Sequence, residues 1–534
     1  MITWANGGRD PATANGRWRA WAWVLVALIG YASVPAWPAP AAPAEDEDES
    51  AEMAKLPPGE KAARKACTMC HVFPTPDLLD KKHWREQVLP RMKVRLGLAI
   101  PDYSTTPDAA LIQERKIYTD KPMVPPDQWP LIEEFYEKNA PEEPLPQDAH
   151  GEIKVGLPCF RLEPPRFRQP IPQTTLVKIS PASHRIFVGD DKSQSLFILD
   201  ADGRGLEQYT LDNIPADVVE RPEGLYVTCV GSFIPTERYC ASFVFLPRDG
   251  ESFGEPKVIL KDLPRACQAA FADFNGDGKP DFALCMFGNL TGRFSWFENL
   301  GEGQYREHVL ANHSGSEACV VHDFNKDGKP DLAVLMANEV EMIIIMLNDG
   351  KGNFTSQMVL QKPPAYGHVT FELDDFNGDG RMDLLVVNGD NGEYDSPLKK
   401  YHGLRIYLDK GDLEFEEAFF YPLNGAYKAI ARDFDGDGKL DIAAISYFPD
   451  YVKSPRESFV FLRGEGGLKF SASTFRECIA GRWLVMDAGD LDGDGQPDLV
   501  LGSYATGPGA APAFLQKMWK EQGPSVVILR NTRP

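Results

Sequence analysis

The pattern of apolar and polar positions divides the chain into two regions of different texture. In residues 59–140, apolar side chains recur at the spacing of amphipathic helices. In residues 173–534, short apolar runs alternate with Gly, Asn and Asp, which is typical of β-strands joined by tight turns. A Pro-rich stretch, residues 141–172, lies between them and is predicted to be a linker. We therefore expect a multidomain protein, with a small all-α domain followed by an all-β domain.

The first residues have the pattern of a targeting segment. Basic residues precede an apolar run over residues 21–34, and small residues follow it. We interpret residues 1–44 as a signal peptide, with a retained N-terminal membrane anchor as the alternative. Residues 45–58 form an acidic, Pro-rich linker. Both interpretations place the rest of the chain outside the cytoplasm, in the periplasm or on the outer face of the cytoplasmic membrane.

The β region repeats one nine-residue motif, D-x-[DN]-x-D-G-x-x-D, five times. The copies begin 50, 52, 58 and 57 residues apart, and each is followed by an apolar run. This period, with several short strands in each unit, predicts a β-propeller. Two further units without the motif, near residues 185–200 and 224–246, bring the expected number of blades to seven. The last unit lacks an outer strand, which residues 159–162 or 174–179 are expected to supply.

The motif has the chemistry of a calcium loop. Side-chain oxygens at positions 1, 3, 5 and 9 and a main-chain carbonyl at position 7 can surround one Ca²⁺, and Gly at position 6 permits the turn. About five Ca²⁺ ions, with a structural role, are therefore expected. The alternative is a set of Asp/Gly turns that hold no metal. The predicted ligands are Asp273, Asn275, Asp277, Lys279 and Asp281; Asp323, Asn325, Asp327, Lys329 and Asp331; Asp375, Asn377, Asp379, Arg381 and Asp383; Asp433, Asp435, Asp437, Lys439 and Asp441; and Asp490, Asp492, Asp494, Gln496 and Asp498.

These five loops and the strands after them resemble the FG-GAP/VCBS family of calcium-loop β-propellers. The resemblance extends over roughly residues 266–534. It implies a propeller in which each blade that carries the motif is tied by one metal ion.

The helical region contains the sequence C-x-x-C-H at Cys67, Cys70 and His71. Two thiols on one helical turn can form thioethers with a haem, and the adjacent histidine can bind the iron. A thioredoxin-like pair would follow a strand, and a zinc ribbon would need a second C-x-x-C; neither pattern is present. We therefore predict one covalently bound haem c, and the region resembles a small monohaem cytochrome c domain.

The second axial ligand is predicted from the order of the segments. Met123 lies in a Pro-rich loop just before the last predicted helix, as the Met ligand does in the small cytochromes c that this region resembles. Met92 is the alternative, although its spacing from neighbouring apolar residues is explained by core packing. A histidine, His83 or His150, or an iron open on one side, completes the alternatives.

The net charge limits the classes of partner that the protein can bind. The formal net charge of −22 excludes a nucleic-acid partner, because phosphate binding needs clustered Lys and Arg. We expect an exported c-type cytochrome in electron transfer, whose partner is a redox protein or a membrane-bound electron-transfer complex. The alternatives are an oxidoreductase whose propeller binds a substrate or second cofactor, and a calcium-dependent adhesion or assembly module.

A long polar insertion, residues 388–403, is the candidate contact segment, through Asp390, Glu393, Asp395, Tyr401 and His402.

Overall fold

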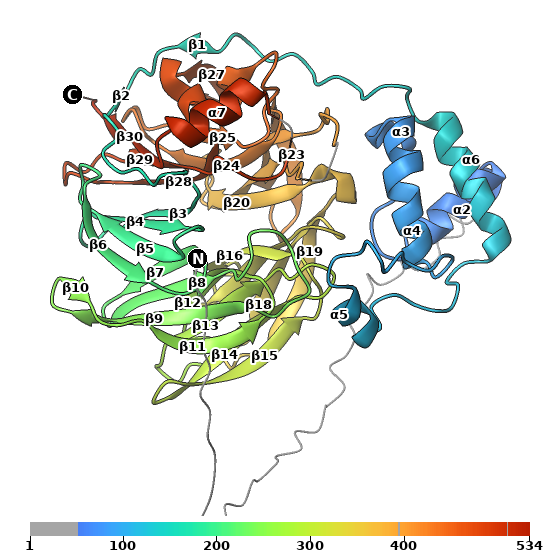
Figure 1. Cartoon of the computed structure of the whole chain (residues 1–534), viewed down its shortest axis with the longest axis horizontal. Coiled ribbons are helices and arrows are strands. Elements are labelled where there is room, and N and C mark those ends of the chain that lie inside the picture. Colours follow the sequence, from blue (N-terminus) through green and yellow to red (C-terminus); the bar gives the residue numbers. More distant parts are fainter. Residues whose placement is uncertain (1–51, 393–395, 510, 534) are drawn as a thin grey trace, which may run out of the picture. The chain divides into compact units, whose positions relative to one another are not determined.

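The computed structural model describes residues 52–392, 396–509 and 511–533. Within these residues, a group of short helices is followed by seven β-sheets (Figure 1). The predicted signal peptide lies outside the described residues, as does the first half of the acidic linker, residues 45–51. Among the described residues, no helix combines the length and the apolar character that crossing a membrane requires.

The helical segment, residues 58–139, forms a small core of its own. Its helices are α2 (Pro58–Cys67), α3 (Lys81–His83), α4 (Leu89–Arg95), α5 (Ala109–Glu114) and α6 (Trp129–Asn139). Alanines at 62, 63 and 66 give α2 a smooth face, which lets the buried Trp129, Ile132 and Tyr136 of α6 pack close to it. The Tyr136 hydroxyl donates to the Pro74 carbonyl at 2.8 Å, so its one polar group is satisfied inside the core.

The seven sheets are the blades of a β-propeller, which confirms the expected number. The strands follow in chain order. Blade 1 contains β3 (Thr174–Ile179), β4 (Ile186–Asp190), β5 (Ser195–Leu199) and β6 (Gly205–Thr210). Blade 2 contains β7 (Pro215–Arg221), β8 (Gly224–Cys229), β9 (Ala241–Asp249), β10 (Ser252–Phe253) and β11 (Lys257–Leu263). Blade 3 contains β12 (Ala266–Ala272), β13 (Asp281–Met286), β14 (Arg293–Gly301) and β15 (Gln304–Ala311). Blade 4 contains β16 (Ser316–His322), β17 (Asp331–Met336), β18 (Met342–Asn348) and β19 (Phe354–Gln361).

The remaining three blades follow the same plan. Blade 5 contains β20 (His368–Asp374), β21 (Asp383–Asn388), β22 (Gly403–Asp409) and β23 (Phe415–Pro422). Blade 6 contains β24 (Ala426–Arg432), β25 (Asp441–Ser446), β26 (Phe459–Gly466), β27 (Lys469–Thr474) and the short β1 (Lys154–Val155). Blade 7 contains β28 (Trp483–Gly489), β29 (Asp498–Ser503), β30 (Val526–Asn531) and β2 (Phe160–Leu162).

The first strand of every blade carries the same irregularity. Each of these strands shifts its register against the second strand after its first paired residue, as at Ala266 and Gln268 in β12. Such a shift is a β-bulge, which increases the local twist of the strand. Blades 1 and 2 show it although they lack the Asp-rich motif, so all seven units share one backbone plan.

The ring closes by sharing a blade. Strand β2 pairs antiparallel with β30, with Phe160 opposite Asn531, and supplies the outer strand that blade 7 would otherwise lack. This confirms the first of the two expected sources, since residues 174–179 instead form the inner strand of blade 1. A strand taken from before blade 1 joins the two ends of the array and covers a free edge.

Two elements of blades 6 and 7 were not predicted from the pattern of strands in the sequence. Helix α7 (Ala513–Glu521) lies between β29 and β30, where its Leu515 and Trp519 are buried against Tyr451 of the preceding blade. Strand β1 adds in parallel to β27 and extends blade 6 to five strands.

Candidate functional site

The Asp-rich motifs lie between the first and second strands of blades 3 to 7, and we name them loop 1 to loop 5 in chain order. In each loop, the Asp at position 1 accepts a hydrogen bond from the amide of the Gly at position 6, at 2.7–3.0 Å. That Gly has a positive φ of 80–83° in all five loops. Because residues with a Cβ rarely adopt this backbone conformation, Gly is required there. The expected role of the position 6 Gly is confirmed.

The Asp at position 9 is the buried part of each loop. These five aspartates are at most 1% exposed, and each accepts at least two main-chain hydrogen bonds. For Asp281, the donors are the amides of Phe274 at 3.1 Å and Asn299 at 2.8 Å. Burial raises the pKa of all five groups, that of Asp441 to about 6. A nearby cation would stabilise the ionised forms of these carboxylates.

The Asp at position 5 faces the side chain at position 7 in four loops. Lys279 lies 2.9 Å from Asp277, and the equivalent pairs are Lys329–Asp327 at 3.0 Å, Arg381–Asp379 at 2.5 Å and Lys439–Asp437 at 2.8 Å. Loop 5 has Gln496 at this position instead. The side chains at position 7 therefore partly neutralise loops 1 to 4 and do not neutralise loop 5.

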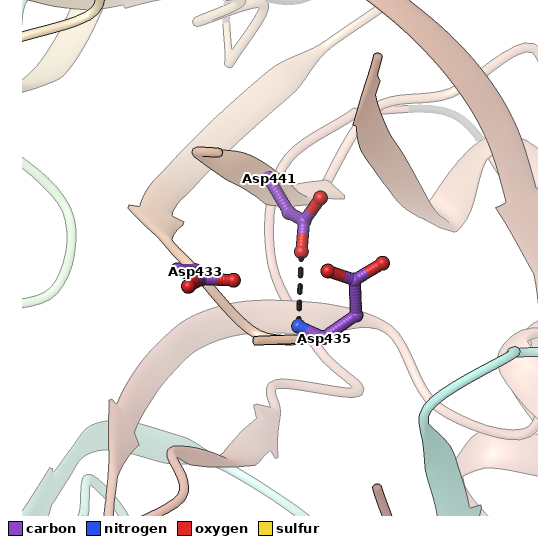
Figure 2. Close-up of side chains that lie close together, drawn as sticks. All are labelled: Asp433, Asp435 and Asp441. Carbon is purple, nitrogen blue, oxygen red and sulfur yellow. Dashed lines mark hydrogen bonds between the residues drawn. The ribbon is translucent and has the colours of Figure 1, made fainter. Parts of the chain in front are cut away.

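Two of the loops bring three carboxylates close enough to share one ion. Oxygens of Asp433, Asp435 and Asp441 in loop 4 lie within 4.8 Å of one another, and so do those of Asp490, Asp492 and Asp494 in loop 5. Figure 2 shows the loop 4 group, in which the Asp435 amide also donates to Asp441 at 3.3 Å. Oxygen-only donors of this kind suit Ca²⁺. The donor sets of loops 4 and 5 therefore fit the predicted ion.

The loops also contact neighbouring blades. The side-chain amide of Asn348 in blade 4 donates to the Phe274 carbonyl of loop 1 at 3.0 Å. The amide of Asn531 in blade 7 donates to the Phe434 carbonyl of loop 4 at 2.8 Å. Ordering of a loop is thereby coupled to the packing of the next blade.

The C-x-x-C-H sequence spans the end of α2. Cys67 is the last residue of α2, Cys70 and His71 follow in a turn, and the His71 Nδ1 lies 2.9 Å from the Val72 carbonyl. This bond assigns the proton to Nδ1 and leaves the Nε2 lone pair for a metal. Burial lowers the pKa of His71, which keeps the ring neutral as a ligand must be. Burial raises the pKa of Cys67 to about 11. These donors fit a covalently attached haem.

The candidates for the second axial ligand differ in their surroundings. Met123 is 49% exposed, and its main-chain amide donates to the Leu96 carbonyl at 2.9 Å. Met92 packs against the core of the helical segment. His83 contacts Asp80 at 2.5 Å, and both ring nitrogens of His150 have partners, the Gly151 carbonyl and Glu457. Met123 is thus the candidate whose side chain is held least by the protein itself.

The insertion at residues 388–403 is anchored by a residue that the sequence did not single out. Arg405 is buried and donates to Asn388 at 2.8 Å and to the Tyr401 carbonyl at 2.8 Å. Tyr401 and His402 are buried as well, so neither is an exposed contact residue. Glu393 and Asp395 lie outside the described residues.

Comparison with known proteins assigns the repeats. Residues 273–334, 323–386, 375–444 and 433–501 match the model of the FG-GAP-like repeat. These residues are FG-GAP-like repeats. The FG-GAP-like match contains all five Asp-rich loops, whereas blades 1 and 2 precede it.

Solved structures and curated proteins add little to this assignment. Among solved structures, one similar chain is described as the crystal structure of BBS1N in complex with ARL6DN, soaked with mercury. It is 8% identical, the match covers 69% of this chain and 96% of that chain, and the TM-score is 0.41. No curated protein matches the chain.

Proposed function

We propose that the protein is an exported c-type cytochrome that transfers electrons. One covalent haem, held at Cys67, Cys70 and His71, is its redox centre, and the propeller, stabilised by calcium in loops 1 to 5, is the docking scaffold. The observation that carries the proposal is the geometry of His71, whose Nδ1 lies 2.9 Å from the Val72 carbonyl and so leaves Nε2 as the nitrogen with the lone pair, directly after the two cysteines in the sequence. This is the donor arrangement that c-type haem needs.

The helical segment supplies the surroundings that such a group requires. A bound haem would supply one-electron redox chemistry to this segment. Cys67 and Cys70 would hold it covalently, His71 would bind one side of the iron, and Met123 would offer a thioether sulfur to the other. Met69 and Met123 are both exposed, at 39% and 49%, in the two segments that provide these ligands. A bound haem would offer these exposed apolar side chains an apolar surface to pack against.

Location and partners follow from the same proposal. Covalent haem attachment takes place outside the cytoplasm, which agrees with the predicted signal peptide or anchor at residues 1–44. We infer that electrons pass to or from a redox protein or a membrane-bound electron-transfer complex.

The test is spectroscopic and uses the full chain. A pyridine-haemochrome assay should give one haem per chain, and a redox titration should show one reversible one-electron step. Absence of haem would reject the proposal. If a small-molecule substrate reduced the haem and was consumed in repeated turnovers, the oxidoreductase alternative would replace it.

A further inference from the structure

The five loops differ in charge at position 3, and the difference is matched elsewhere in the blade. Loops 1 to 3 have Asn at position 3, whereas loops 4 and 5 have Asp435 and Asp492. In blades 3 to 7, one residue of the third strand has a main-chain amide that donates a hydrogen bond to the position 9 Asp. The residue directly before it occupies an equivalent position in all five blades. That residue is Glu298, Leu347 or Leu408 in the first three blades and Arg463 or Arg530 in the last two. The extra carboxylate thus occurs together with an arginine.

Arg530 is the more buried of the two arginines. Its side chain is 9% exposed, and its Nη1 lies 2.7 Å from Asp498 and 3.7 Å from Asp492. Its Nη2 donates to the Ala201 carbonyl of blade 1 at 2.7 Å. One guanidinium therefore neutralises the acidic loop of the closing blade and binds the blade on the other side of the closure. A buried pair of this kind is costly to break, because the remaining charge loses its partner.

Arg463 makes a weaker version of the same contact. Its Nε donates to Asp435 and its Nη2 lies 3.5 Å from Asp437, but the side chain is 46% exposed. Solvent screens such a pair, so its contribution is small. Loop 4 also has Lys439 as a counter-charge, whereas loop 5 has Gln496 at that position. Loop 5 is therefore the loop in which the arginine matters most.

Loop 5 remains reachable from solvent. A cavity of about 390 Å³ opens beside it, lined by His184, Asp200, Asp202 and Asp492 among others. Asp492 is itself 43% exposed. A cation can thus approach Asp492 from the cavity while Arg530 contacts the loop from the third strand.

We propose that Arg530 is a resident counter-ion of loop 5, which keeps the closing blade folded before calcium binds and weakens calcium binding at that loop. This rests on the proposed calcium binding. Loops 1 to 3 have no equivalent arginine, but they also lack the position 3 carboxylate and have Lys279, Lys329 and Arg381 at position 7 as counter-charges. Arg530 therefore supplies in loop 5 the counter-charge that position 7 supplies in loops 1 to 4.

The test compares thermal unfolding of the full chain in chelator and in calcium. In Arg530→Met, the propeller midpoint should fall in chelator, and the increase produced by calcium should be about twofold larger than in the wild type, because the ion now replaces the missing charge. Competition with a chelator should show loop 5 binding calcium about tenfold more tightly, since site charge tunes affinity. Arg530→Lys retains the charge but cannot make both guanidinium contacts, so its calcium response should stay like that of the wild type while its midpoint falls equally in chelator and in calcium. Arg306→Met, which removes an exposed ion pair with Glu298, is the matched control and should leave the calcium response unchanged.

A reciprocal change in loop 2 keeps the idea testable if Arg530→Met does not fold. Asn325→Asp should lower the midpoint in chelator, and adding Leu347→Arg should restore it. If Arg530→Met lowers the midpoint equally in chelator and in calcium, Arg530 is a packing residue and the proposal fails. Failure of Leu347→Arg to restore the midpoint would also contradict it. If the wild type does not respond to calcium at all, the proposed calcium binding itself is wrong.

Discussion

The helical segment and the propeller are stabilised in opposite ways. The α-helical elements are 3 to 11 residues long, with α3 and α4 joined by a π-helical turn (Trp84–Val88), and their hydrophobic core contains only residues from 62 to 140. Helical elements as short as most of these are marginal without tertiary support. The propeller has seven hydrogen-bonded sheets, and buried clusters join neighbouring blades, as between blades 5 and 6. The helical segment thus depends on one small hydrophobic core, whereas the propeller is stabilised by contacts between successive blades.

Removing the haem-binding thiols should produce the largest difference between the two regions. In Cys67→Ala/Cys70→Ala, we expect complete loss of covalent haem and loss of most helical structure, because the helical core is small. The β-signal of the propeller should not change. A haemochrome assay measures the covalent haem, and circular dichroism measures the helical and β-strand signals. Cys240→Ala, at an exposed position in the propeller, is the control and should retain its haem. Unfolding of both regions together would show that they are not independent.

Removing calcium should have the reverse effect. Each occupied site contributes about 2.7 kcal/mol to the free energy of unfolding when free calcium is a hundred times its Kd. Calorimetry with and without chelator should therefore show the propeller transition moving to lower temperature and the helical transition staying nearly fixed. Equal movement of both transitions, or of neither, would contradict the assignment of the loops.

The two methionines separate ligation from packing within the helical segment. Met123→Ala should abolish the near-infrared band of sulfur-ligated ferric haem and lower the reduction potential, because the iron loses its sixth ligand. It should cost little stability, since Met123 is exposed. Met92→Ala should keep the band and destabilise the segment by roughly 1–3 kcal/mol, as truncation of a partly buried side chain does. The opposite pair of phenotypes would transfer the ligand to Met92.

The smallest expected effect is a pH dependence of one linker contact. The hydrogen bond that the His150 Nε2 donates to the Glu457 carboxylate raises the pKa of His150 above its usual range, so the protonated histidine stabilises the folded state. This contribution is fully present below about pH 6.5, the unfolded value, and is lost as the pH rises through the higher folded value. The difference in midpoint between the wild type and His150→Gln should therefore decrease from pH 6 to pH 8. A difference that is constant with pH would contradict the ion pair.

Local patterns predicted the parts of the molecule that depend on short-range geometry. Asp, Asn and Gly at fixed positions predicted the loops, because a nine-residue turn is closed by hydrogen bonds between its own side chains and amides. The predicted FG-GAP-like repeats and the seven blades are confirmed. The haem and the calcium ions stay predictions. The insertion at residues 388–403 was harder to predict. Its expected contact residues Tyr401 and His402 are buried, and Arg405, which anchors the segment, lies outside the polar stretch.

The sequence by itself therefore determined the repeat and the turn residues, since these involve residues within one loop, and it predicts the donor sets of the two candidate sites. Only the tertiary structure decided how the ring closes and which charges meet. Strand β2 reaches β30 across more than 360 residues, and Arg530 meets Asp492, Asp498 and the Ala201 carbonyl only after blades 7 and 1 are adjacent. Such contacts depend on the summed twist of all seven blades, which no local pattern records.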